Sequence, residues 1–228
     1  MKKLLIYLPF LLIGCTISQP VVYRTDDLSA PLSTKPIPIM IDIKILSDNR
    51  NVIKENGLQF SDPRQTKIDG KIICINSEKH YKKDSVVSQM TRMMVEHFNK
   101  ARLFKMTFYS QSKFSSYYMT GTLNNFYGEQ EFSKAAAVGA QFGLIGALAT
   151  AGIKTPGKII IEIADLKLFT KDGTLVKDFG SFYREYKDDF KADGYCWCMY
   201  FNINEKLKDF NSGLIEKIRS DLADIKFD

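Results

Sequence analysis

The four cysteines are the residues of this 228-residue sequence with the most distinctive chemistry. Cys15 stands alone near the N-terminus, where two lysines precede an apolar run over residues 4–13 and Gly14 comes directly before the cysteine. A positively charged start, a short apolar stretch and a small residue before the cut site are typical of a secretory signal peptide. The apolar run is much shorter than the ~20 residues that a membrane-spanning helix needs. We therefore expect an exported protein.

The residues Leu12-Ile13-Gly14-Cys15 resemble the lipobox of bacterial lipoproteins. The resemblance implies that the Cys15 sulfur receives a diacylglycerol, that residues 1–14 are cut away, and that the new amine is acylated. Thr16 stands where an Asp favours inner-membrane retention in enteric bacteria, so the resemblance implies a lipid anchor in the outer membrane. We expect the body to face the periplasm, with surface exposure as the alternative. The competing interpretation of Cys15 is an ordinary signal peptide with a chance cysteine.

The other three cysteines are Cys74, Cys196 and Cys198. Disulfides form in oxidising compartments, but an odd number of cysteines cannot all pair within one chain. One residue separates Cys196 from Cys198, so in an extended segment their side chains point the same way, which is awkward for a mutual bridge. We favour a bridge from Cys74 to one of the two. The histidines His80 and His97 fall in no zinc-ligand spacing, so no metal is expected.

The sequence contains no recognisable catalytic or nucleic-acid-binding motif. Neither a nucleophile elbow, nor a zinc-protease helix, nor a phosphate-binding glycine loop is present. Without the two leader lysines the chain carries 30 basic and 26 acidic residues, a net formal charge of +4 that is too evenly mixed for a nucleic-acid groove. We expect a protein that is not an enzyme, has no cofactor and does not bind nucleic acid.

The segment Ala135–Ile153 carries no charge over 19 residues and is rich in Ala and Gly. Gly139 and Gly143 form a Gly-x-x-x-Gly pair, and Gly146 follows nearly one turn later. Small residues at this spacing let helix backbones approach closely, as in membrane helix pairs. We expect a helical segment that serves either for buried packing or self-association, or for contact with a membrane; a disordered excursion is the third alternative.

The hydrophobic pattern predicts strands and helices in mixed order around that segment. Isoleucines at alternate positions from Ile37 to Ile45 predict a strand with one buried face. Apolar stripes over residues 86–101 and from about Asn204 to Ile225 predict two amphipathic helices. Lys171-Asp172-Gly173 predicts a hairpin turn. Further strands are expected at residues 71–76, 105–110, 117–126, 158–169 and 174–186, and a charged loop at 187–195.

Strict alternation along residues 158–169 assigns the side chains of that strand to two faces. Ile159, Ile161 and Ile163 fall on one face, and Leu166 and Leu168 fall on the other.

These elements predict one α+β domain over residues 37–228, with a mixed or antiparallel sheet backed by two amphipathic helices and the Gly/Ala-rich helical segment inserted before a C-terminal hairpin. Proline-punctuated residues 15–36 are expected to form a flexible tether. The order of elements behind the lipobox resembles a group of Gram-negative envelope lipoproteins that includes the auxiliary lipoproteins of ABC-type lipid transporters and the curli-secretion type. The resemblance implies a non-enzymatic structural or accessory subunit of an envelope transport or secretion assembly, with protein partners or self-association. The alternatives are a lipid or small-molecule carrier and a surface adhesin.

Overall fold

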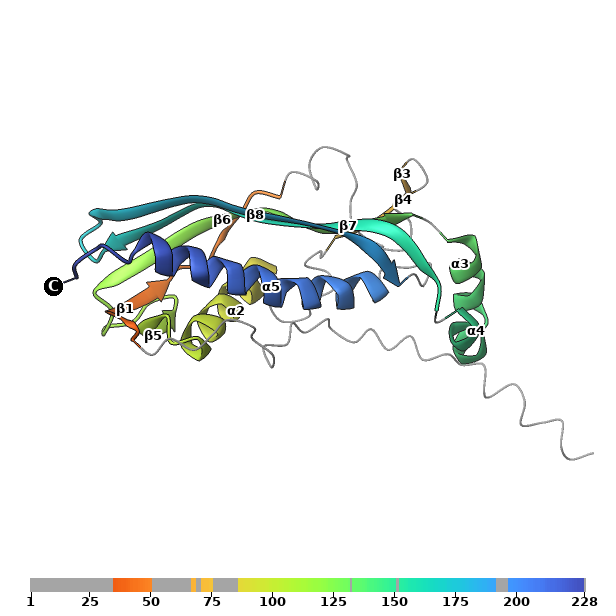
Figure 1. The fold of residues 1–228 in the computed structure, drawn as a ribbon, viewed down its shortest axis with the longest axis horizontal. Helices are drawn as coiled ribbons and strands as arrows, with labels where there is room; N and C mark the ends of the chain where they lie inside the picture. Colours follow the sequence, from red (N-terminus) through yellow and green to blue (C-terminus); the bar gives the residue numbers. More distant parts are fainter. Residues whose placement is uncertain are drawn as a thin grey trace, which may run out of the picture.

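The computed structural model describes residues 35–50, 67–68, 71–75, 86–131, 133–150, 152–191 and 197–227. Cys15, the predicted signal peptide, nearly all of the predicted tether, His80 and Cys196 lie outside the described residues. The predicted α+β class is confirmed: one mixed sheet is covered by helices on one side (Figure 1). The elements are β1 (Ile37–Ile43), β2 (Ser47–Asp48), β3 (Lys67–Ile68), β4 (Lys71–Ile75), α2 (Val86–Lys100), β5 (Phe104–Tyr109), β6 (Tyr117–Glu131), α3 (Lys134–Gln141), α4 (Gly143–Thr150), β7 (Lys154–Thr170), β8 (Leu175–Lys191) and α5 (Trp197–Asp221).

Three long antiparallel strands, β6, β7 and β8, form the length of the sheet. The start of β6 also pairs in parallel with β1, which pairs in parallel with β5, and the end of β6 pairs with β4. The turn predicted at Lys171-Asp172-Gly173 is confirmed, because the Thr170 amide donates to the Thr174 carbonyl at 2.9 Å and Gly173 has a φ of +94°. This arrangement places the first described residues at one end of the sheet and the connection from β6 to β7 at the other.

Helices α2 and α5 lie side by side on the same face of the sheet, where they enclose the core (Figure 1). The stripe predicted on α2 is buried, from Val86 through Met90 and Met94 to Phe98. The stripe predicted on α5 is also buried, and it includes Leu207, Leu214 and Ile218. Both amphipathic helices are therefore confirmed, although α5 begins at Trp197, seven residues before the predicted start.

The predicted faces of β7 are wrong beyond Ile163. Asp165 adopts a φ of +50°, and the pairing register shifts between Ile163 and Leu166. This β-bulge inserts one residue and turns the following side chains over. Leu166 and Leu168 therefore join Ile159, Ile161 and Ile163 in the core instead of lying on the opposite face.

Two further strand predictions differ from the structure at their ends. Strand β1 ends at Ile43, and Ile45 is 49% exposed instead of continuing the buried face. The loop predicted to begin at residue 187 begins later, because β8 continues to Lys191. Residues 187–191 pair with the start of β7, and Phe190 among them is buried in the core, which holds this charged stretch in the sheet.

A candidate contact site at the tip of the sheet

The apolar Gly/Ala-rich segment forms a hairpin of two short helices, α3 and α4, between the ends of β6 and β7 (Figure 1). Ser133 caps α3, because its side-chain oxygen accepts from the Ala136 amide at 3.2 Å. α3 ends at Gln141, and the next residue, Phe142, caps it: the Phe142 amide donates to the Gly139 carbonyl at 3.0 Å. The Thr150 hydroxyl, at the end of α4, donates to the Gly146 carbonyl at 2.9 Å. We call this unit the α3–α4 hairpin.

Two of the three glycines singled out in the sequence hold the hairpin together. A Cβ atom on Gly146 would lie 1.9 Å from the Gly139 carbonyl oxygen, and one on Gly139 would lie 2.4 Å from Cγ2 of Thr150. Only glycine permits so close an approach of the two backbones. Gly139 and Gly146 are therefore buried against each other within the chain, and Gly143 begins α4.

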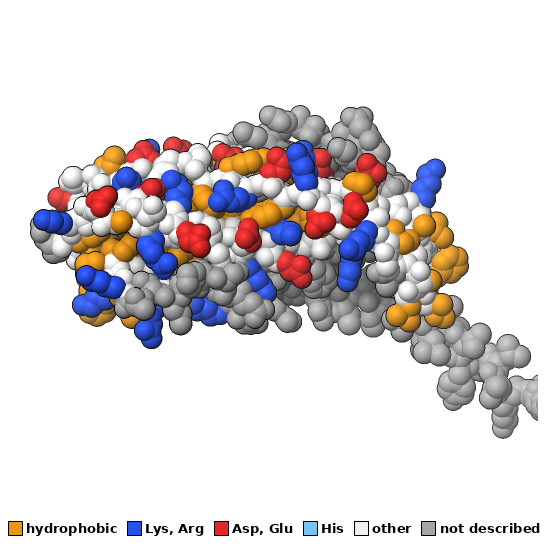
Figure 2. Space-filling view, viewed as in Figure 1, with side chains coloured by type: hydrophobic (Ala, Val, Ile, Leu, Met, Phe, Trp, Pro, Cys, Tyr) orange, Lys and Arg blue, Asp and Glu red, His pale blue; other side chains and the backbone are white. Residues whose placement is uncertain are grey.

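The outer surface of the hairpin consists of large apolar side chains that are exposed. Val138 is 52% exposed, and the exposed fractions of Phe142, Ile145 and Leu148 are 71%, 81% and 69%. Figure 2 shows hydrophobic side chains gathered at the end of the molecule formed by α3 and α4. We call these four residues the apolar tip.

A groove of about 690 Å³ runs along the same hairpin. Its lining is apolar except for Lys134 and Thr150, and it includes Phe142, Ile145 and Gly146. A side chain or acyl chain in this groove would therefore meet mainly carbon atoms.

Sequence reasoning singled out this segment, with buried packing among the alternatives for its glycines, but it did not identify the residues on the outer surface. It chose the glycines, whereas the exposed residues are Phe142, Ile145 and Leu148, which recur at every third position. This spacing along an uncharged helix was the signal that could have found them. Contact of the segment with a membrane or with another copy stays a prediction.

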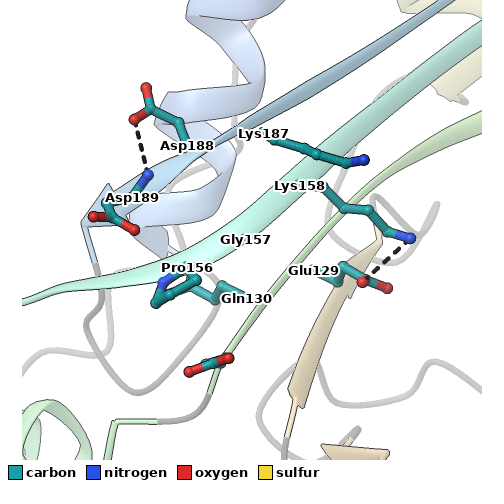
Figure 3. A pocket seen from close by; sticks show the side chains of 9 residues that line it. Glu129, Gln130, Pro156, Gly157, Lys158, Lys187, Asp188 and Asp189 are labelled. Atoms are coloured by element: carbon teal, nitrogen blue, oxygen red, sulfur yellow. Dashed lines mark hydrogen bonds and ion pairs between the residues drawn. The ribbon is translucent and has the colours of Figure 1, made fainter.

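A second, charged pocket of about 540 Å³ lies on β6, β7 and β8 (Figure 3). Its charges are divided between its two ends: Lys158 is paired with Glu129 at 3.3 Å, while Asp188 and Asp189 lie apart from that pair. The Asp188 carboxylate accepts from the Asp189 amide at 2.8 Å, and Lys187 pairs with Glu185 at 3.3 Å, outside the pocket. Among the described residues no group of three His, Cys, Asp or Glu side chains converges as a metal site. The pocket therefore offers no converging charge for a ligand.

His97 lies on α2 and is fully buried in the core. Neither of its ring nitrogens has a hydrogen-bond partner within the described part of the chain. Burial first, and then the positive charges of Lys100 and Lys208, lower the pKa of His97 to about 4. The imidazole is therefore neutral at physiological pH and has no access to solvent, so it is part of the core and not of a surface site.

The structure describes two of the three cysteines of the predicted disulfide but not the predicted anchor cysteine. Cys74 belongs to β4 and Cys198 to α5, while Cys196 and Cys15 lie outside the described residues. The bridge from Cys74 stays a prediction. None of the helices in the described part of the chain combines the length and apolar character needed to cross a membrane.

No family model matches the chain, and no curated protein matches it. Two solved structures are similar in fold. One is the crystal structure of a Xanthomonas campestris protein of the DUF330 family, which is 11% identical, with 85% of this chain and 94% of that chain covered and a TM-score of 0.47. The other, described only as an uncharacterized protein, is 9% identical, with 84% of this chain and 99% of that chain covered and a TM-score of 0.40.

Proposed function

We propose that this protein is a bacterial envelope lipoprotein, held to the outer membrane through Cys15, that acts as a non-enzymatic accessory subunit of an envelope transport or secretion assembly. The leader and the lipobox-like residues Leu12–Cys15 support the anchor. The observation that carries the accessory role is the apolar tip, because three of its side chains are more than two-thirds exposed. Such clustered apolar exposure is typical of a surface that contacts another molecule.

The charged pocket supports a role without catalysis. Its Glu129 and Lys158 neutralise each other, and its two adjacent aspartates lie apart from that pair. A general acid or base needs a group positioned within hydrogen-bond reach of a substrate and tuned towards neutral pH. Because the charges of the described pocket residues do not converge, we place the function in contact and tethering.

Metabolic labelling with a fatty acid tests the anchor. The wild-type chain is expected to take up label, and Cys15→Ser is expected to take up none. Cys74→Ser is the control, because it removes a thiol that the proposal does not acylate. Equal labelling of the wild type and Cys15→Ser would refute the lipoprotein assignment.

The size of the detergent-extracted complex tests the accessory role. The triple variant Phe142→Ser/Ile145→Ser/Leu148→Ser is expected to fold normally, since these side chains are exposed. It is expected to dissociate from the large complex and to elute at a smaller size. Phe114→Ser removes an equally exposed phenyl ring (72%) from the loop before β6 and should leave the complex intact. An unchanged complex size in the triple variant would refute a role of the tip in assembly.

A carrier of lipid or another apolar small molecule is the second candidate, and the groove on the α3–α4 hairpin favours it. Its volume is within the range of small-molecule sites. Native mass spectrometry of protein extracted from membranes would detect a bound lipid of fixed mass. A spectrum of the bare lipoprotein alone would exclude this alternative.

A further inference from the structure

We propose that the apolar tip inserts into the interfacial layer of an anionic lipid bilayer. This inference rests on the proposed envelope location and names the partner of the tip. It concerns Val138, Phe142, Ile145 and Leu148, with the lysines at the base of the hairpin.

The tip by itself is smaller than a stable protein interface, so in the proposed assembly it would supply only part of a larger contact, whereas a bilayer is a partner that it fits alone. Four mostly exposed apolar side chains present on the order of 400 Å² of surface, about half of the ~800 Å² per partner that a stable interface buries. In a bilayer each inserted side chain leaves water independently, so a small patch is sufficient.

The shape of the hairpin sets the depth of insertion. Each helix has eight residues, which corresponds to a length of about 12 Å, whereas the hydrocarbon core of a bilayer is about 30 Å thick. The tip can therefore enter the headgroup and upper acyl region but not cross the bilayer. The Ser133 cap and the bond from the Phe142 amide to the Gly139 carbonyl satisfy part of the helix ends, and the other end groups would stay in the hydrated headgroup region.

The charges around the hairpin are complementary to anionic headgroups. Lys134 and Lys154 bracket the uncharged segment, and Lys191 lies opposite Lys154 in the β7–β8 pairing. All three are exposed, and none forms an ion pair with another described residue. The acids nearest to these lysines are Glu131, which lies opposite Lys71 in the β4–β6 pairing, and Asp188 and Asp189, which lie further along the sheet from the hairpin, opposite Gly157 and Pro156. Lysines close to an anionic surface each contribute a factor of about five in binding.

The anchor and the tip can reach the same membrane. Lys35, which precedes β1, lies at the end of the body away from the tip, because β1 pairs with the start of β6 and α3 follows its end. Nineteen residues lie between Cys15 and Lys35, and the twenty residue steps span at most ~70 Å. The 15 residues of β6 extend about 50 Å, and the parallel pairing of Ile41 with Tyr117 puts Lys35 about 20 Å further away, so a fully extended chain from Cys15 reaches about as far as the end of β6.

Vesicle co-sedimentation of the mature polypeptide, residues 16–228 without leader or acyl groups, tests the proposal. All described elements follow residue 35, so this chain retains them. The wild type is expected to bind vesicles of phosphatidylglycerol mixed with phosphatidylethanolamine and to bind neutral phosphatidylcholine vesicles more weakly. Phe142→Ser/Ile145→Ser/Leu148→Ser should reduce binding to the anionic vesicles about tenfold or more, whereas Phe114→Ser should leave it unchanged.

A second variant separates the charge from the apolar contact. Lys134→Gln/Lys154→Gln/Lys191→Gln should weaken binding to anionic vesicles about tenfold or more but leave binding to neutral vesicles unchanged. Equal vesicle binding by the wild type and the triple serine variant would overturn the proposal. The proposal would also be overturned if the triple serine variant lost self-association in light scattering but bound vesicles like the wild type. That result would indicate that the tip contacts a second copy of the chain. Neither result alters the Cys15 labelling experiment, so the anchor and the tip fail independently.

Discussion

The buried His97 makes the stability of this protein depend on pH in a defined direction. Its side chain is 0% exposed, and its pKa falls from 6.5 to about 4, first because of burial and then because of Lys100 and Lys208. In the unfolded chain the imidazole takes up a proton near pH 6.5, whereas in the folded chain it does so only near pH 4. The unfolded state therefore binds more protons between these values, and the free energy of unfolding decreases as the pH falls through this window.

The size of this effect follows from the two pKa values. The difference between pKa values of 6.5 and about 4 lowers the free energy of unfolding by about 3 kcal/mol once the pH is below both values. Above pH 7 the contribution is constant, because the imidazole is neutral in both states. His97→Leu removes the titrating group and also two nitrogens without hydrogen-bond partners among the described residues, so we expect the variant to be at least as stable at neutral pH.

Urea denaturation followed by circular dichroism at pH 7.5, 6, 5 and 4.5 measures this contribution. Both chains carry His80→Gln, so that no second imidazole titrates, and the difference between them cancels the carboxylates that titrate in both. The chain with His97 should lose about 2 kcal/mol more than His97→Leu between pH 7.5 and 4.5. Parallel pH dependences for the two chains would refute the assignment of a neutral, desolvated imidazole.

Two further predictions concern positions that organise the backbone. Gly146→Ala should separate α3 from α4, because the new Cβ would lie 1.9 Å from the Gly139 carbonyl oxygen. Amide hydrogen exchange in the hairpin should then accelerate about tenfold or more. Gly152→Ala is the control: its Cβ would meet nothing within 4 Å, so the exchange rates should not change. Protected hairpin amides in Gly146→Ala would contradict the close packing. Asp42→Asn should lower the free energy of unfolding by about 1–3 kcal/mol, because the buried carboxylate accepts from the Ser112 amide at 3.0 Å and the Ser115 hydroxyl at 2.5 Å. The exposed Asp165→Asn is its control, and equal midpoints in chemical denaturation would contradict this role of Asp42.

Much of the fold could be predicted because the buried faces of its helices and strands consist of apolar residues at regular spacing. The stripes of α2 and α5 and the hairpin turn before Thr174 depend on local spacing and on the conformational freedom of Gly173, so the sequence alone reveals them. The wrong predictions concern positions where one inserted residue, or a strand distant in the sequence, determines the local structure. The bulge at Asp165 reverses the face of Leu166, and the pairing with the start of β7 keeps the charged residues 187–191 in a strand.

For the candidate site, the sequence by itself determined that residues 135–153 are uncharged and dense in small residues, and that Cys15 follows a leader-like segment. Composition and spacing are local properties, so no structure was needed to find them. Only the tertiary structure decided which residues of the segment face outward. The two helix backbones are in contact at Gly139 and Gly146, and in this arrangement the side chains of Phe142, Ile145 and Leu148 are exposed to solvent. The glycines therefore build the tip, and the large apolar side chains beside them form its surface.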